Sequence, residues 1–186
     1  MEFWYALFGI LVLVMLFPYL RCFCKRLILK SKLKKACNNK GYLLHPAHPL
    51  WYFGSGRSKM CDLHVETKEE ILSIKLFCMP RRHTVLVFGE QGEYYSRRFI
   101  VLSYFGGAIH FPINQKKKQM PNYDFRHGYK DEWQKKPAKQ ILLVNPVPME
   151  FRRTQNEREI GVDPRDIINN LNVYSLNDLL SLLENS

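Results

Sequence analysis

The chain has 186 residues with 46% hydrophobic and 24% charged side chains, and its formal net charge is +11. Its five cysteines lack the spacing of a disulfide framework, which suits a reducing compartment, and the sequence contains no internal repeat or low-complexity segment. Residues 21–40 supply 8 of the 28 lysines and arginines, so residues 41–186 hold only 20 basic and 16 acidic groups. The positive charge therefore does not favour a nucleic acid partner.

The first predicted element is a membrane-spanning helix. Residues 3–20 contain no charged side chain. At about 1.5 Å per helical residue this segment is roughly 27 Å long, close to the hydrocarbon thickness of about 30 Å. No positive region precedes it and no small-residue cleavage site follows it, so we expect residues 1–20 to be an uncleaved transmembrane anchor.

A basic segment, residues 21–40, follows the predicted span. Because lysine and arginine near a span stay on the cytoplasmic side, we expect a single-pass protein of the cell membrane with its N-terminus outside and its C-terminal domain in the cytoplasm. Leu29, Leu33, Ala36 and Cys37 recur at helical spacing, which predicts a helix that ends near Asn38. The remaining faces are basic, and we expect them to contact anionic lipid headgroups. The candidate membrane-surface residues are Arg21, Lys25, Arg26, Lys30, Lys32, Lys34 and Lys35.

Residues 41–186 are long enough for one α+β domain with its own core. Alternating apolar and polar residues, separated by short turns, predict four successive strands in an antiparallel β-meander. The strands are expected at 62–67, 71–77, 83–88 and 93–104. The last run is apolar on both parities after Arg98, so its second half should be covered on both faces.

The second half of the domain is less regular. Residues 112–139 form a polar, basic, proline-bearing stretch, and a loop of this length is usually functional or mobile. Ser175 followed by Asp178 predicts the start of a C-terminal helix over 176–184. That helix should bury four leucines, Leu176, Leu179, Leu180 and Leu183. Shorter strands are expected at 108–111, 140–144, 149–153 and 172–174.

Two Cys-His pairs have a spacing that invites a zinc hypothesis. Cys61 precedes His64 by three residues, and Cys78 precedes His83 by five. On one strand an odd separation directs side chains to opposite faces, and the paired CxxC of a zinc knuckle is missing. We therefore expect no metal and no cofactor, with ordinary buried thiols and strand histidines at these positions.

Asp62 on the first predicted strand and the Ser73-Ile74-Lys75 tripeptide on the second resemble the core of the restriction-endonuclease-like nucleases. In that family an acid on one strand and a Glu-x-Lys on the next hold a divalent metal. The order of elements is also similar, with a preceding helix, a run of strands, and a later strand before a terminal strand-helix unit. Ser73 stands where the resemblance requires the second carboxylate, so it implies a degenerate, inactive nuclease-type domain with Asp62 and Lys75 as its remnants.

Three functional hypotheses follow. The first is a non-enzymatic interaction or scaffold module at the membrane surface that binds a protein partner or the leaflet. The second is the inactive nuclease-type domain, and the third is a nucleic-acid-binding domain without chemistry, because basic residues near aromatics can bind phosphates and stack bases. For the first, the candidate partner-binding residues are Arg97, Arg98, Lys116, Lys117 and Lys118.

Overall fold

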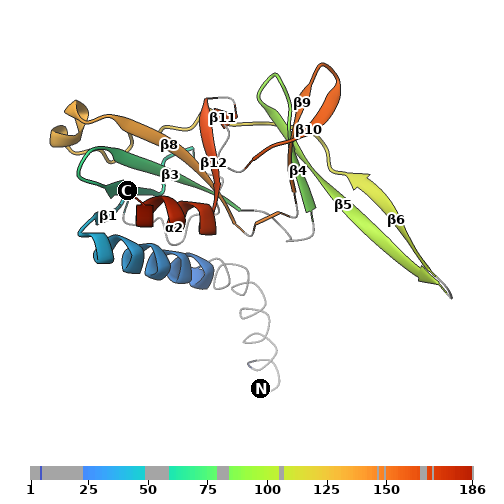
Figure 1. Cartoon of the computed structure of the whole chain (residues 1–186), viewed down its shortest axis with the longest axis horizontal. Coiled ribbons are helices and arrows are strands. Elements are labelled where there is room, and N and C mark those ends of the chain that lie inside the picture. The colour runs from blue at the N-terminus through green and yellow to red at the C-terminus, as the bar shows by residue number, and fades with distance from the viewer. Residues whose placement is uncertain are drawn as a thin grey trace.

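The computed structural model describes residues 5, 23–48, 59–78, 84–104, 107–145, 147–148, 150–163, 167–168 and 170–185. It confirms a strand-rich α+β domain with a C-terminal helix (Figure 1). The predicted span at 3–20 lies outside these residues, apart from Tyr5. None of the helices described is both long and apolar enough to cross a membrane.

The first sheet contains six strands in the order β1-β2-β3-β8-β12-β11. β3 pairs with β8 and β8 pairs with β12 in parallel, whereas the other neighbours are antiparallel. The strands are β1 (Leu43–Pro46), β2 (Leu63–Glu66), β3 (Ile71–Cys78), β8 (Ala138–Asn145), β12 (Leu171–Ser175) and β11 (Ile167–Ile168).

The second sheet is built from segments that the chain adds between strands of the first. Its order is β10-β9-β4-β5-β6, and β7 pairs with β5. One excursion, between β3 and β8, supplies β4 to β7, and a second, after β8, supplies β9 and β10. The strands are β4 (Thr84–Phe88), β5 (Glu93–Tyr104), β6 (Gly107–Asn114), β7 (Lys118–Gln119), β9 (Glu150–Gln155) and β10 (Arg158–Gly161).

Two helices cover one face of the first sheet (Figure 1). They are the N-terminal helix, described over residues 23–40, and α2 (Leu176–Asn185). The predicted stripe of Leu29, Leu33, Ala36 and Cys37 is buried there, as are Leu179 and Leu183 of α2, which confirms both helical patterns. Leu176 and Leu180 are partly buried against the same cluster.

β8 is buried on both faces. Ile141 and Leu143 pack with the helices, while Leu142 and Val144 pack with Leu86 and other residues of the second sheet. This explains why residues 141–144 of β8 are continuously apolar, since this part of a central strand has no solvent-facing side.

The C-terminal end of the N-terminal helix and the N-terminal end of α2 have sequence-encoded caps. Gly41 has a φ of 71°, and the Gly41 and Tyr42 amides donate to the carbonyls of Asn38 and Cys37, which is a Schellman motif. At α2 the Ser175 hydroxyl and the Asp178 carboxylate bond each other's backbone amides at 3.2 and 3.3 Å. The predicted N-cap is therefore confirmed.

The predicted meander is wrong at its centre. The β2–β3 and β4–β5 hairpins form as expected, but β3 and β4 belong to different sheets. β8 takes the free edge of β3 over its full length, from Ile71↔Ala138 to Cys78↔Asn145. β4 is buried along its whole length in the second sheet instead, between β9 and β5.

The 112–139 stretch is not one open loop. It includes the end of β6, the short strand β7, the 3-10 helix η1 (Asp131–Lys135) and the start of β8. Trp133 and Phe125 are buried, and Trp133 packs on the ring of His64 in β2. This stretch therefore covers the face of β2 and β3 opposite the helices.

Candidate functional site

Three charged side chains meet in the interior of the domain. Asp62, Lys75 and Arg26 are each only 1% exposed. The Lys75 ammonium lies 3.0 Å from Asp62 Oδ2, and Arg26 Nη1 lies 3.7 Å from Asp62 Oδ1. We call these three residues the charged cluster.

The hairpin register produces the Asp62–Lys75 pair. β2 and β3 pair Leu63 with Ile74, and the Asp62 amide donates to the Ile74 carbonyl, so Asp62 lies beside Lys75 on the neighbouring strand. Arg26 arrives from the N-terminal helix, where it is one turn before Leu29 on the buried stripe. Residues 26, 29, 33 and 37 recur at helical spacing, and this pattern indicates that Arg26 faces the core.

Backbone groups complete the charged cluster. The Leu76 amide donates to Asp62 Oδ2 at 2.8 Å, and the Lys75 ammonium donates to the Met60 carbonyl at 2.6 Å. Desolvating three charges costs several kcal/mol per ion, and this cost is offset only when attraction and hydrogen bonds are both good. Loss of one partner would leave a buried charge uncompensated.

The cluster does not suit a divalent metal. Two cations already face the one carboxylate of Asp62, so the site is positively charged before any metal arrives. Glu66, the nearest carboxylate along β2, instead pairs with Lys136 at 2.9 Å and lies 3.8 Å from His45. The hydrogen bond from Lys136 lowers the pKa of Glu66. Across the part of the chain that the structure describes, no three histidines, cysteines or acids are grouped for a metal.

Ser73 takes part in a buried network of neutral groups rather than a metal site. Its Oγ lies 2.7 Å from the Tyr129 hydroxyl and 3.2 Å from His64 Nδ1. His64 Nε2 lies 2.8 Å from the His127 carbonyl, so Nε2 carries the proton and donates it. Burial lowers the pKa of His64 and favours this neutral form. The network fastens the segment around Tyr129 to the sheet.

Cys61 and His64 are closer than strand alternation predicts. Cys61 Sγ lies 3.9 Å from His64 Nδ1, because β2 begins only at Leu63 and Cys61 is outside the pleat. The expectation of opposite faces was therefore wrong. Burial raises the pKa of Cys61 to about 12, so the side chain is a thiol and not a thiolate ligand. It donates to the carbonyls of Leu63 and Ile74.

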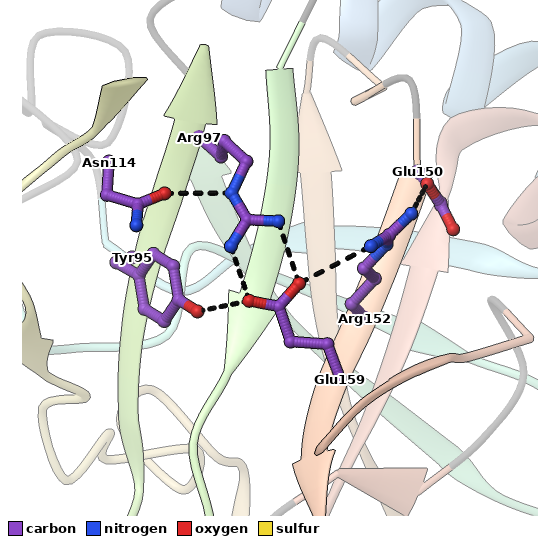
Figure 2. Close-up of polar contacts among 6 residues, drawn as sticks. All are labelled: Tyr95, Arg97, Asn114, Glu150, Arg152 and Glu159. Carbon is purple, nitrogen blue, oxygen red and sulfur yellow. Dashed lines mark hydrogen bonds and ion pairs between the residues drawn. The ribbon is translucent and has the colours of Figure 1, made fainter. Parts of the chain in front are cut away.

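A second polar group is formed by side chains of the second sheet (Figure 2). Both terminal nitrogens of Arg97 donate to the Glu159 carboxylate, and the Tyr95 hydroxyl donates to Glu159 at 2.6 Å. Arg152 bridges Glu159 at 3.4 Å and Glu150 at 2.9 Å. The hydrogen bonds from Arg97 lower the pKa of Glu159.

This network joins three strands across a fourth. Arg97 and Glu150 both pair in register with Val85 of β4, and Val85 is 1% exposed. The ion pairs thus span an apolar strip, and Arg97 is engaged within the domain rather than available to a partner.

The other predicted surface residues are placed as follows. Lys116, Lys117 and Lys118 are exposed, and Lys117 pairs with Glu93 at 3.1 Å. Arg98 is half-buried. On the N-terminal helix Lys25, Lys32, Lys34 and Lys35 are exposed and Lys30 is half-buried, whereas Arg26 is interior and does not belong to this surface. Arg21 lies outside the described residues.

A pocket of about 510 Å³ opens between the β4–β5 turn, residues 119–125 and the start of β12. Its polar lining is supplied mainly by amide side chains, among them Gln91, Asn122 and Gln140. It is separate from the charged cluster, and the sequence contained no motif that pointed to it.

Comparison with known proteins adds no family: no protein-family model, curated protein or solved structure matches this chain. Its function must be inferred from the arrangement of its own side chains.

The neutral state of His64 has a consequence for stability. The pKa of His64 is lowered in the folded protein from 6.5, so the folded state binds fewer protons and stability should fall as pH drops below 6.5. His64→Gln keeps a donor toward the His127 carbonyl but does not titrate. We expect this variant to lose less of its unfolding free energy between pH 7 and pH 5 than the parent does, measured by urea unfolding of the full chain in detergent. If the unfolding free energies of the two proteins changed equally between pH 7 and pH 5, His64 would not be the group that titrates in this range.

Proposed function

We propose that this chain is a single-pass protein of the cell membrane whose cytosolic α+β domain is a non-enzymatic interaction or scaffold module built on an inactive nuclease-type core. The observation that carries the proposal is the charged cluster. Lys75 and Arg26 occupy both oxygens of Asp62 at 3.0 and 3.7 Å, and Ser73 supplies a hydroxyl where a second metal-binding acid would be needed.

The topology supports the nuclease-type core. A helix precedes the β1–β2–β3 meander, Asp62 and Lys75 lie on its second hairpin, and β8 and β12 add in parallel before the terminal α2. This is the element order that the resemblance to restriction-endonuclease-like nucleases implies. The metal chemistry of that family needs two converging anionic ligands, and this core offers one carboxylate neutralised by two cations.

The uncharged segment 3–20 and the basic segment 21–40 support the membrane location. Four exposed lysines of the N-terminal helix, Lys25, Lys32, Lys34 and Lys35, are suited to anionic headgroups. With its polar core groups engaged in the fold, the domain offers its exposed surface to a protein partner.

The inactive core predicts no response to divalent cations. The full chain in detergent should show no rise in melting temperature with millimolar Mn²⁺ or Mg²⁺, and no metal-dependent nicking of supercoiled DNA, because Asp62 is already neutralised. A metal ion present at 100 times its dissociation constant would raise the free energy of unfolding by about 2.7 kcal/mol. A shift of this size is readily detected in the melting temperature. A metal-dependent rise that is absent in Asp62→Asn but retained in the surface control Glu69→Gln would refute the inactive core.

The anchor predicts resistance to alkaline extraction. Expressed full-length protein should stay in the membrane pellet after carbonate treatment. The double variant Leu11→Arg/Val14→Arg should be released, because each arginine at the centre of a span costs about 2.5–3.5 kcal/mol. Leu27→Arg/Ile28→Arg, which adds the same two charges at exposed positions of the N-terminal helix, is the matched control and should stay in the pellet. Release of the parent protein by carbonate would contradict the anchor.

A further inference from the structure

β5 and β6 continue beyond the second sheet as a two-stranded hairpin. The pairing of β4 with β5 stops at Thr84↔Arg98, whereas β5 and β6 stay paired as far as Tyr104↔Gly107. From Phe99 to Tyr104, β6 is therefore the only strand that pairs with β5 in the described part of the chain. Figure 1 shows this hairpin projecting away from the body of the molecule. We call residues 99–104 and 107–112 the hairpin arm.

The composition of the arm does not suit a strand pair in water. Residues 99–115 contain no lysine, arginine, aspartate or glutamate, and 99–102 are four consecutive apolar residues. An isolated two-stranded hairpin is at best marginally stable in water, and apolar residues on both parities give it no polar face. The arm therefore needs an apolar environment against at least one of its faces.

Basic residues bracket the arm at its base. Arg97 and Arg98 precede it and Lys116, Lys117 and Lys118 follow it. The pairings Arg97↔Asn114 and Arg98↔Ile113 bring both groups to the end of the arm nearest the body. Arg97 and Lys117 have acidic partners, whereas Lys116 and Lys118 are exposed and have no ion pair among the described residues. An uncharged arm thus projects from a positively charged base.

We infer that the hairpin arm is a second membrane contact, lying in the interface of an anionic leaflet with Lys116 and Lys118 on the headgroups. This inference rests on the proposed membrane location and names a lipid surface as the occupant of the arm. In Figure 1 the hairpin arm slants toward the lower right of the view, and the N-terminal helix lies below the first sheet.

The backbone limits how deep the arm goes. Its six-residue strands are roughly 20 Å long at about 3.4 Å per residue, but their outer edges have unpaired amides and carbonyls. Such edges are not tolerated in hydrocarbon, so the arm lies along the interface, where water and headgroups satisfy the edges. Interfacial elements bury their apolar side by roughly 5–10 Å.

Charge argues against a second copy of this chain as the occupant. Two arms packed side by side in the same direction would bring two copies of the same basic base together, and like charges at close range oppose association. Anionic headgroups complement that base instead.

A photo-crosslinker in the arm tests the inference. The full chain with p-benzoylphenylalanine in place of Ser103 is reconstituted into vesicles of phosphatidylglycerol and phosphatidylcholine, irradiated and examined by mass spectrometry. We expect lipid adducts at position 103 at least several-fold above those at Glu157, which lies in the exposed β9–β10 turn. Lys116→Gln and Lys118→Gln should each lower the yield about fivefold, and vesicles of phosphatidylcholine alone should lower it too.

Position 12, in the predicted span, separates this inference from the proposed function. Lipid adducts at 12 but not at 103 would overturn the arm inference and leave the anchor standing. Adducts between 103 and a second copy, or another protein, would overturn it as well. Absence of adducts at 12 would instead refute the membrane anchor.

Discussion

Asp62 is a buried carboxylate held between two cations, and three parts of the chain meet on it. Arg26 belongs to the N-terminal helix, Asp62 directly precedes β2 of the first sheet, and Lys75 lies in β3. Because each of these charges would be costly to bury alone, each fixes the position of the other two. The N-terminal helix and the β2–β3 hairpin are thereby positioned relative to each other.

The charged cluster also connects the fold with the proposed location. Arg26 comes from the same basic segment that follows the predicted span, so one residue of that segment is fixed in the core while its lysines remain exposed. We propose that this arrangement holds the domain close to the leaflet rather than at the end of a loose tether. The hairpin arm, with its basic base, would then give the domain a second contact and a defined orientation on the membrane.

Local patterns in the sequence predicted much of the fold. The Leu29 and Leu33 stripe, the Ser175 cap and the two hairpins depend on interactions a few residues apart, so periodicity reveals them. The split into two sheets does not follow from such patterns, because the turns around residue 80 look alike whether the next strand pairs with β3 or leaves it. The split depends on the pairing of β3 with β8, a strand that is distant in the sequence.

The candidate site was predictable in part. Asp62 and Lys75 were singled out by their spacing on adjacent strands, and they do meet. Arg26 was predicted to lie on the membrane surface because it belongs to a basic segment, although its helical position is on the apolar stripe. The proximity of Cys61 to His64 was missed because alternation was assumed to begin before the strand does.

The most direct test of this account is a double-mutant cycle between Asp62→Asn and Lys75→Met, with unfolding free energies measured by urea titration of the full chain in detergent. If the charged cluster organises the fold, each single variant should lose about 3–5 kcal/mol. The double variant should then lose at least 1 kcal/mol less than the sum of the two. Strictly additive losses, each below about 1 kcal/mol, would show that the fold does not depend on this interaction.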